Sequence, residues 1–284
     1  MIARRAWAAL LLLTAAAKVA AATTNELSDA EVEGRNLARQ LCELRPAESF
    51  TNASTLSIRP AKGRKREFPL RTVTTLTETN WVTVYEILPN TNAPDCQRLT
   101  VTYDGTQPNG YTLAYLQTNG VVEITLGTNG ANVSHQGNPD GGSAFLAFEV
   151  RDFPGRALTM YPFASSDFWL ADLGLEFLHW PGQTMLKKEL RSGQSCYVLE
   201  SINPHPVTNG YARVVSWIDI DSVQQSDQPG LIHADAYDAK GKLLKEFEWK
   251  EVEKVNGRWQ VSEVQMRNTR TGSRTTLKFN FGKP

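Results

Sequence analysis

The chain has 284 residues, and its thirty basic and thirty acidic side chains give no formal net charge at neutral pH. This balance excludes the strongly basic surface of a nucleic-acid-binding protein, so we expect no nucleic-acid partner. The three cysteines, Cys42, Cys96 and Cys196, allow at most one disulfide within the chain, and the sequence does not select the pair.

The first 22 residues have the pattern of a secretory signal peptide. Arg4 and Arg5 precede an apolar run at residues 6–17, and small residues follow at residues 19–22. The run is shorter than the roughly 20 residues that a membrane-spanning helix needs, so an uncleaved membrane anchor is the less favoured alternative. The sequence therefore predicts an exported protein that is soluble after cleavage.

One amphipathic helix and then a series of short strands are predicted after this peptide. Ser28 and Glu31 form a capping-box pattern before apolar residues at helical spacing, which predicts a helix over residues 29–44. Further along, apolar and polar residues alternate with period two, for example at residues 81–87 and 277–281. Asn-Gly pairs, which supply the positive backbone angles of tight hairpin turns, separate several of these runs. The pattern predicts a mainly β protein (α+β) with antiparallel strands.

Residues 23–284 are predicted to form one domain. No low-complexity linker divides them, and strand patterns, including one at residues 144–150, flank the weakest candidate boundary at residues 137–143. The strand pattern at residues 211–221 carries apolar side chains on both faces. A sheet of that kind is either covered on both sides or encloses something.

The chemistry-bearing residues do not form a strong catalytic or metal-binding motif. The four histidines are scattered, without an HExxH or CxxC pair, and no GxSxG elbow occurs. Residues 138–149 match a calcium-loop template only in part, because Ser143 stands where the template requires glycine. Asp219 and Asp221 share one strand parity and could act as an acid–base pair, but we favour a strand end that reaches solvent. We expect no metal, no cofactor and no enzymatic activity.

Residues 168–180 (FWLADLGLEFLHW), here called the apolar segment, contain nine apolar residues among thirteen. Exposing such a segment forfeits roughly 25 cal/mol for each square ångström of apolar surface left in water. It must therefore be covered by core, by a partner or by a hydrophobic ligand. Taken alone, the pattern favours a segment docked permanently on a sheet as core.

A series of motifs in the second half of the chain resembles the outer-membrane lipoprotein-sorting family, the group around the periplasmic carrier LolA and its uncharacterised relatives. In order, the motifs are SSDFWLADLGLEF, SCYVLES, YARVVSWIDID, AYDAKGKLLKEFEW and VQMRNTRTGSRTTLKF, within residues 161–281. The resemblance covers roughly half of the mature chain and is closer to the relatives than to the carrier. It implies a curved antiparallel half-barrel sheet with covering helices and a hydrophobic cavity for acyl chains.

In this interpretation the apolar segment is a lid over the cavity. Asp172, Glu176 and His179 are expected to face water, and Gly174 interrupts the helix and is expected to let it hinge. Each methylene buried from a lipid tail contributes roughly 0.8 kcal/mol, so one acyl chain could hold the lid displaced. The predicted lining residues are Phe168, Leu170, Leu173, Phe177 and Leu178 from the lid, and Tyr197, Trp217 and Phe247 from the sheet.

The resemblance implies a periplasmic binding or carrier protein for lipid or lipoprotein acyl chains, acting in outer-membrane lipoprotein sorting. Its other expected partner is a membrane-anchored donor or acceptor protein. The alternative is a periplasmic sensor or interaction module of the same fold that reads envelope or lipoprotein status. A hydrolase that uses Asp219 and Asp221 is the least favoured hypothesis.

Overall fold

The computed structural model describes residues 27–88, 96–105, 107–117, 120–127, 130–137, 159–225, 230–255 and 257–281. The predicted signal peptide, the strand predicted at residues 144–150 and the calcium-loop candidate at residues 138–149 lie outside this part of the chain. Cys42 and Cys196 are free thiols.

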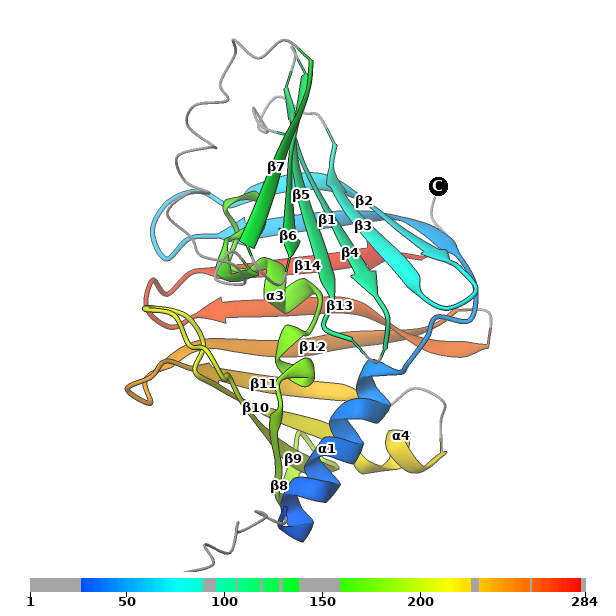
Figure 1. Ribbon diagram of the computed structural model, residues 1–284, viewed down its shortest axis with the longest axis vertical. Coiled ribbons are helices and arrows are strands. Elements are labelled where there is room, and N and C mark those ends of the chain that lie inside the picture. Colours follow the sequence, from blue (N-terminus) through cyan, green and yellow to red (C-terminus); the bar gives the residue numbers. More distant parts are fainter. Residues whose placement is uncertain are drawn as a thin grey trace, which may run out of the picture.

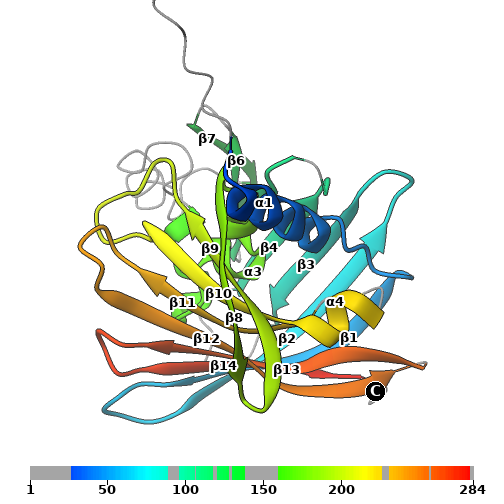
Figure 2. The same ribbon diagram turned by 90° about the horizontal axis from the view of Figure 1, so that it is seen from below.

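In the part of the chain that the structure describes, fourteen strands form one open, curved antiparallel sheet (Figures 1 and 2). Their order is β7-β6-β5-β4-β3-β2-β1-β14-β13-β12-β11-β10-β9-β8, so β7 and β8 are the edges of the sheet. The strands are β1 (Phe50–Arg59), β2 (Arg66–Leu76), β3 (Trp81–Ile87), β4 (Cys96–Tyr103), β5 (Gly110–Gln117), β6 (Gly120–Gly127), β7 (Gly130–Gly137), β8 (Gly182–Arg191), β9 (Gln194–Ile202), β10 (Arg213–Asp219), β11 (Leu231–Tyr237), β12 (Leu243–Val255), β13 (Arg258–Asn268) and β14 (Arg274–Asn280). The predicted fold class, a mainly β half-barrel, is confirmed.

The sheet consists of two runs of consecutive hairpins that meet in its centre. Strands β1 to β7 form one half, strands β8 to β14 form the other, and the first strand pairs with the last from Ala53 opposite Asn280 to Arg59 opposite Arg274. The glycines of three Asn-Gly pairs, Gly110, Gly120 and Gly130, are the first residues of β5, β6 and β7.

Short helices cover the concave side of the sheet. α1 (Asp29–Cys42) lies across the open side of the curve (Figure 2), and its capping box is formed, with Ser28 and Glu31 bonded in both directions. The remaining helical elements of the described residues are η2 (Phe163–Ser165), α3 (Leu170–Leu173), η3 (Glu176–His179) and α4 (Ile220–Gln225). None of the helices in the described ranges has the length and apolar content required to cross a bilayer.

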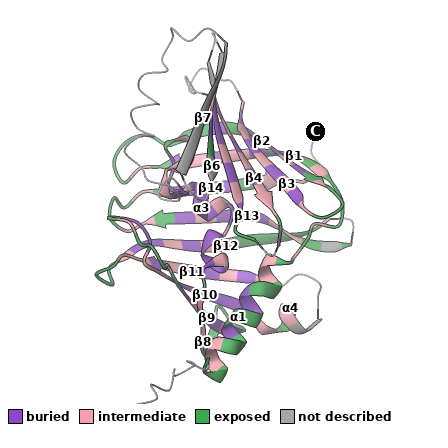
Figure 3. Cartoon of the chain, in the orientation of Figure 1, coloured by how far each residue is buried: buried purple, intermediate pink, exposed green. Residues whose placement is uncertain are grey.

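Alternation along the strands separates a large concave-face core from a small cluster on the other face. In β3 every second residue from Trp81 to Ile87 is buried, as the period-two pattern predicts. The concave-face core includes the apolar segment, which is mostly buried (Figure 3). The smaller cluster consists of Cys196, Val198, Val215 and Trp217 on β9 and β10.

Gly34 provides a test of how α1 docks on the sheet. A Cβ atom at this position would lie 2.7 Å from the backbone nitrogen of Thr184 and 2.8 Å from that of Met185, both in β8. Gly34→Ala should therefore lower the free energy of unfolding by about 1–3 kcal/mol, the usual cost of overpacking. At an exposed helix position the same change is stabilising.

Urea denaturation of Gly34→Ala and of the control Asn36→Ala, an exposed position in the same helix, measures this effect. The control should have unchanged or slightly higher stability. A stabilised Gly34→Ala variant would show that α1 does not contact β8 closely.

Candidate functional site

A cavity of about 770 Å³ lies on the concave side of the sheet, within the roughly 300–1,000 Å³ range of small-molecule sites. Strands β1 to β4 and β12 to β14 form its walls, and the apolar segment forms its floor. Most of the lining is aromatic or aliphatic, and it includes Phe50, Trp81, Tyr85, Tyr103, Phe168, Leu173, Leu178, Phe247, Trp249, Val261, Val264, Leu277, Phe279 and Phe281.

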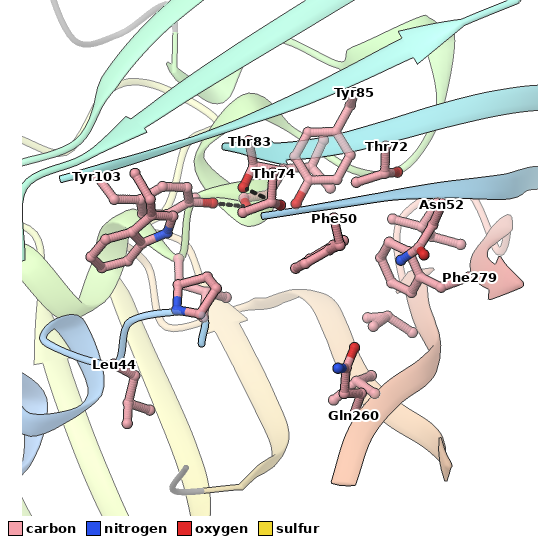
Figure 4. Close-up of a pocket in the computed structure, with 18 of the residues that line it drawn as sticks. Leu44, Phe50, Asn52, Thr72, Thr74, Thr83, Tyr85, Tyr103, Gln260 and Phe279 are labelled. Carbon is pink, nitrogen blue, oxygen red and sulfur yellow. Dashed lines mark hydrogen bonds between the residues drawn. The ribbon is translucent and has the colours of Figure 1, made fainter. Parts of the chain in front are cut away.

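A strip of uncharged polar side chains crosses one wall of the cavity. This polar strip consists of Asn52 on β1, Thr72 and Thr74 on β2, and Thr83 on β3, all of them buried (Figure 4). The hydroxyls of Thr74 and Thr83 are hydrogen-bonded at 3.1 Å, and that of Thr72 is bonded to Ser54 at 3.2 Å. The polar strip therefore supplies hydrogen-bonding groups to a wall that is otherwise apolar.

The rim of the cavity is the connection between α1 and β1. Leu44 and Phe50 are half-buried on its inner side, whereas Arg45 and Glu48 are exposed. The guanidinium of Arg45 donates to the carbonyl oxygens of Glu78 and Thr77, which ties the rim to the β2–β3 turn. Exposed residues among the lining mean that the cavity reaches solvent here.

The apolar segment changes direction at Gly174, as its sequence predicts. This glycine ends α3, and a Cβ atom there would lie 2.2 Å from the hydroxyl oxygen of Tyr111. The Asn109 amide donates to the Gly174 carbonyl at 2.6 Å, and the Tyr103 hydroxyl donates to the Leu173 carbonyl at 3.1 Å. These bonds hold the interruption in place, so the structure gives Gly174 a packing role rather than the geometry of a free hinge.

The prediction that Asp172 and Glu176 face water is wrong, because these two residues are only 3% and 4% exposed, respectively. The hydroxyls of Tyr211 and Tyr111 donate to these carboxylates at 2.9 and 3.0 Å, respectively. Burial raises the pKa of both tyrosines well above the ordinary value, so both remain protonated donors. The sheet curves around the segment and supplies partners to side chains that a surface helix would direct into solvent.

Lys245 neutralises Asp172 inside the protein. Its ammonium nitrogen lies 3.3 Å from Asp172 Oδ2, donates to the carbonyl of Asp167 at 2.6 Å, and stands 3.5 Å from the centre of the Trp169 ring. Burial lowers the pKa of Lys245 to about 8, an effect that the Asp172 carboxylate partly opposes. The Lys245 ammonium therefore remains mainly charged at neutral pH, and its contact with Asp172 fastens the apolar segment to β12.

The start of the apolar segment is fastened to the sheet as well. The Asp167 carboxylate accepts hydrogen bonds from Thr275 at 2.8 Å and Ser273 at 2.5 Å, at the beginning of β14. The backbone N–H of Asp167 in turn donates to the Thr275 hydroxyl at 3.0 Å. Polar bonds thus hold the segment near Asp167, Asp172, Gly174 and Glu176.

The structure places four of the eight predicted lining residues at the cavity, namely Phe168, Leu173, Leu178 and Phe247. Leu170 and Phe177 are buried in the concave-face core and do not line the cavity. Whether the four side chains at the cavity bind a ligand stays a prediction.

Tyr197 and Trp217 also do not line the cavity. Tyr197 packs at the margin of the concave-face core, with the Lys188 ammonium 5.0 Å from its ring centre. Trp217 lies on the opposite face, where the Arg191 guanidinium stands 4.0 Å from its ring centre. Tyr197 lies on β9 and Trp217 lies on β10, and each of these strands carries apolar residues on both faces. The alternation of side chains alone therefore could not identify the concave face of the sheet.

The polar strip and the rim were missed by the sequence interpretation. A signal for the strip is present, because Asn52 and Ser54 share the parity of Leu56, and Thr72 and Thr74 share the parity of Leu70. Polar residues on an inward face next to apolar ones indicate a site where that face meets something other than core. No comparable signal marks the rim.

Comparisons with known proteins agree with this fold. A family model described only as an uncharacterized protein matches residues 150–281, and no curated protein matches the chain. A domain from Vibrio parahaemolyticus, named for outer membrane lipoprotein sorting, is 18% identical with a TM-score of 0.58, over 89% of this chain and 95% of that one.

Two further solved structures are similar. A DUF1329 family protein from Desulfovibrio piger is 19% identical with a TM-score of 0.52, over 89% of this chain and 92% of that one. A LolA superfamily protein from Nitrosomonas europaea is 12% identical with a TM-score of 0.50, over 87% and 91%. The resemblance stated from the motifs is confirmed in the fold that these proteins share.

The buried pair of Lys245 and Asp172 can be tested by a double-mutant cycle. Lys245→Met leaves a buried carboxylate without its counter-charge, which should lower the free energy of unfolding by about 3–5 kcal/mol. Adding Asp172→Asn removes the second charge but keeps an acceptor for Tyr211, so most of the loss should be recovered.

Chemical denaturation of Lys245→Met, Asp172→Asn and the double variant gives the coupling free energy between the two side chains. The control is Lys187→Met, which breaks an exposed ion pair with Glu189 and should change stability little. Additive losses in the double variant would mean that the two charges do not stabilise each other.

Proposed function

We propose that this protein binds acyl chains of a lipid or lipoprotein in the cavity between the curved sheet and the apolar segment. The observation that carries the proposal is the cavity itself, about 770 Å³ in volume and lined mainly by aromatic and aliphatic side chains. Because the cavity reaches solvent, a hydrocarbon tail that enters it removes both its own surface and the apolar walls from water. The named lipoprotein-sorting domain with the same fold supports the same class of ligand.

The tail would enter at the rim rather than beneath the apolar segment. That segment is held by the buried bonds of Asp167, Asp172 and Glu176, whereas the rim residues Arg45 and Glu48 are exposed. Displacing the segment would break several buried polar contacts at once, whereas entry at the rim disturbs exposed hydrogen bonds such as those of Arg45 and Ser49.

The proposed mechanism has no bond-making step and takes place in the periplasm. Each buried methylene contributes roughly 0.8 kcal/mol, so the cavity draws a tail from a donor membrane and releases it where an acceptor offers a better environment. A membrane-anchored donor or acceptor protein is the partner that this exchange requires. A sensor of the same fold would differ in retaining a protein partner rather than a lipid.

Native mass spectrometry of protein purified without detergent tests the proposal. A carrier should retain tail-bearing molecules, seen as additional mass that disappears after organic extraction. Protein that carries no such mass, and that takes up none when mixed with phospholipid vesicles, would contradict acyl-chain binding. Copurification of a membrane-anchored protein without lipid would favour the sensor.

Two valines on opposite faces of the sheet locate the binding space. Val261 lines the cavity, whereas Val82 on β3 alternates with the lining residues Trp81 and Thr83 and therefore points to the other face. Val261→Trp should fill part of the cavity and weaken binding about tenfold or more, the loss expected when two methylenes are displaced.

The matched control Val82→Trp, on the other face of the sheet, should bind as the wild type does. Both affinities are measured by titration with N-phenyl-1-naphthylamine, a fluorescent apolar probe. Equal weakening in the two variants, or none in either, would place the binding space elsewhere.

A further inference from the structure

We propose that the cavity recognises its ligand by an uncharged carbonyl group, the ester or amide carbonyl of an acylated molecule, which accepts hydrogen bonds from Asn52 and Thr72. This inference rests on the proposed function and deepens it. It predicts that the cavity binds acyl esters and amides more tightly than plain hydrocarbons or free fatty acids.

Asn52 supplies the first observation. The residue is 7% exposed, it lines the cavity, and its amide is turned towards the cavity in Figure 4. Its amide nitrogen is buried and has no hydrogen-bond partner among the described residues. A buried donor without a partner is costly, and a ligand that brings an acceptor to this point removes that cost.

Thr72 lies beside this amide. It is the cross-strand partner of Asn52 in the β1–β2 pair, so the two side chains share one face of the sheet. Its hydroxyl is paired with that of Ser54 at 3.2 Å, and such a pair uses only one of its two hydroxyl hydrogens. When Ser54 donates within the pair, the Thr72 hydrogen is available to the same acceptor as the Asn52 amide.

The charges around the cavity favour a neutral acceptor. The polar strip contains no ionisable group, and Arg45 is the one arginine or lysine among the described lining residues. Its guanidinium lies at the rim and donates to backbone carbonyls of the β2–β3 turn. Lys245 is not at the cavity surface and is paired with Asp172. A carboxylate at Asn52 would be buried without a counter-charge, whereas an ester or amide carbonyl needs only the donors that are present.

The test compares methyl decanoate, an uncharged ester, with decanoate as competitors of the carbonyl-free probe N-phenyl-1-naphthylamine. At pH 8 the ester should displace the probe from the wild type at least tenfold more effectively than decanoate does. In Asn52→Leu the inhibition constant of methyl decanoate should rise about three- to tenfold, the value of one hydrogen bond, while the dissociation constant of the probe stays within twofold.

Two further variants accompany this comparison. Thr72→Val should change the inhibition constant in the same direction. The matched control Thr125→Val, an exposed threonine of β6 on the other face of the sheet, should leave it unchanged. Removing the unpaired amide should also leave the thermal transition of Asn52→Leu at or above that of the wild type, which verifies that the variant is folded.

Infrared spectroscopy of methyl decanoate labelled with ¹³C at the carbonyl gives a direct readout. The carbonyl stretch should lie at lower wavenumber on the wild type than on Asn52→Leu, because hydrogen bonding weakens the C=O bond. The same affinity for the ester in both proteins would overturn the role of Asn52 and leave acyl-chain binding standing. If neither the probe nor the ester binds the wild type, the proposed function and this inference both fail.

Discussion

An antiparallel sheet that curves without closing must have its apolar concave face covered by segments that are not strands. In this protein α1 and the apolar segment provide that cover, and β7 and β8 remain as the two edges. Apolar burial alone would hold these segments loosely in register, because the hydrophobic effect has no direction. The buried pair of Asp172 and Lys245, with the tyrosines that donate to the acidic side chains, sets one position for the apolar segment.

This anchoring divides the cavity into a fixed side and an accessible side. The floor contains Phe168, Leu173 and Leu178 in a segment bonded to several strands, whereas the rim is one connection with exposed residues. On the proposed function, a cavity of this kind would exchange its ligand without opening the core. The polar strip adds a directional element to a wall that would otherwise select only for hydrophobicity.

Much of the site was accessible from the sequence, but unevenly. The composition of the apolar segment was enough to predict its burial, and Phe168, Leu173 and Leu178 do reach the cavity. The role of Asp172 was predicted wrongly because its partner Lys245 is 73 residues away, and no local pattern relates the two. Trp217 was misplaced because its strand is apolar on both faces, so that its parity did not reveal which face is concave.

The sequence by itself determined the elements: the capped helix, the period-two strands, the glycine turns and the buried apolar segment. These follow from interactions between residues close in the chain, namely capping bonds, backbone angles and the alternation of side chains across a pleat. Only the tertiary structure decided which face is concave and which charges are paired. It also decided that Asn52 lines the cavity with an amide nitrogen that has no hydrogen-bond partner among the described residues. Those features depend on the curvature of fourteen strands and on contacts between distant residues, which no local pattern contains.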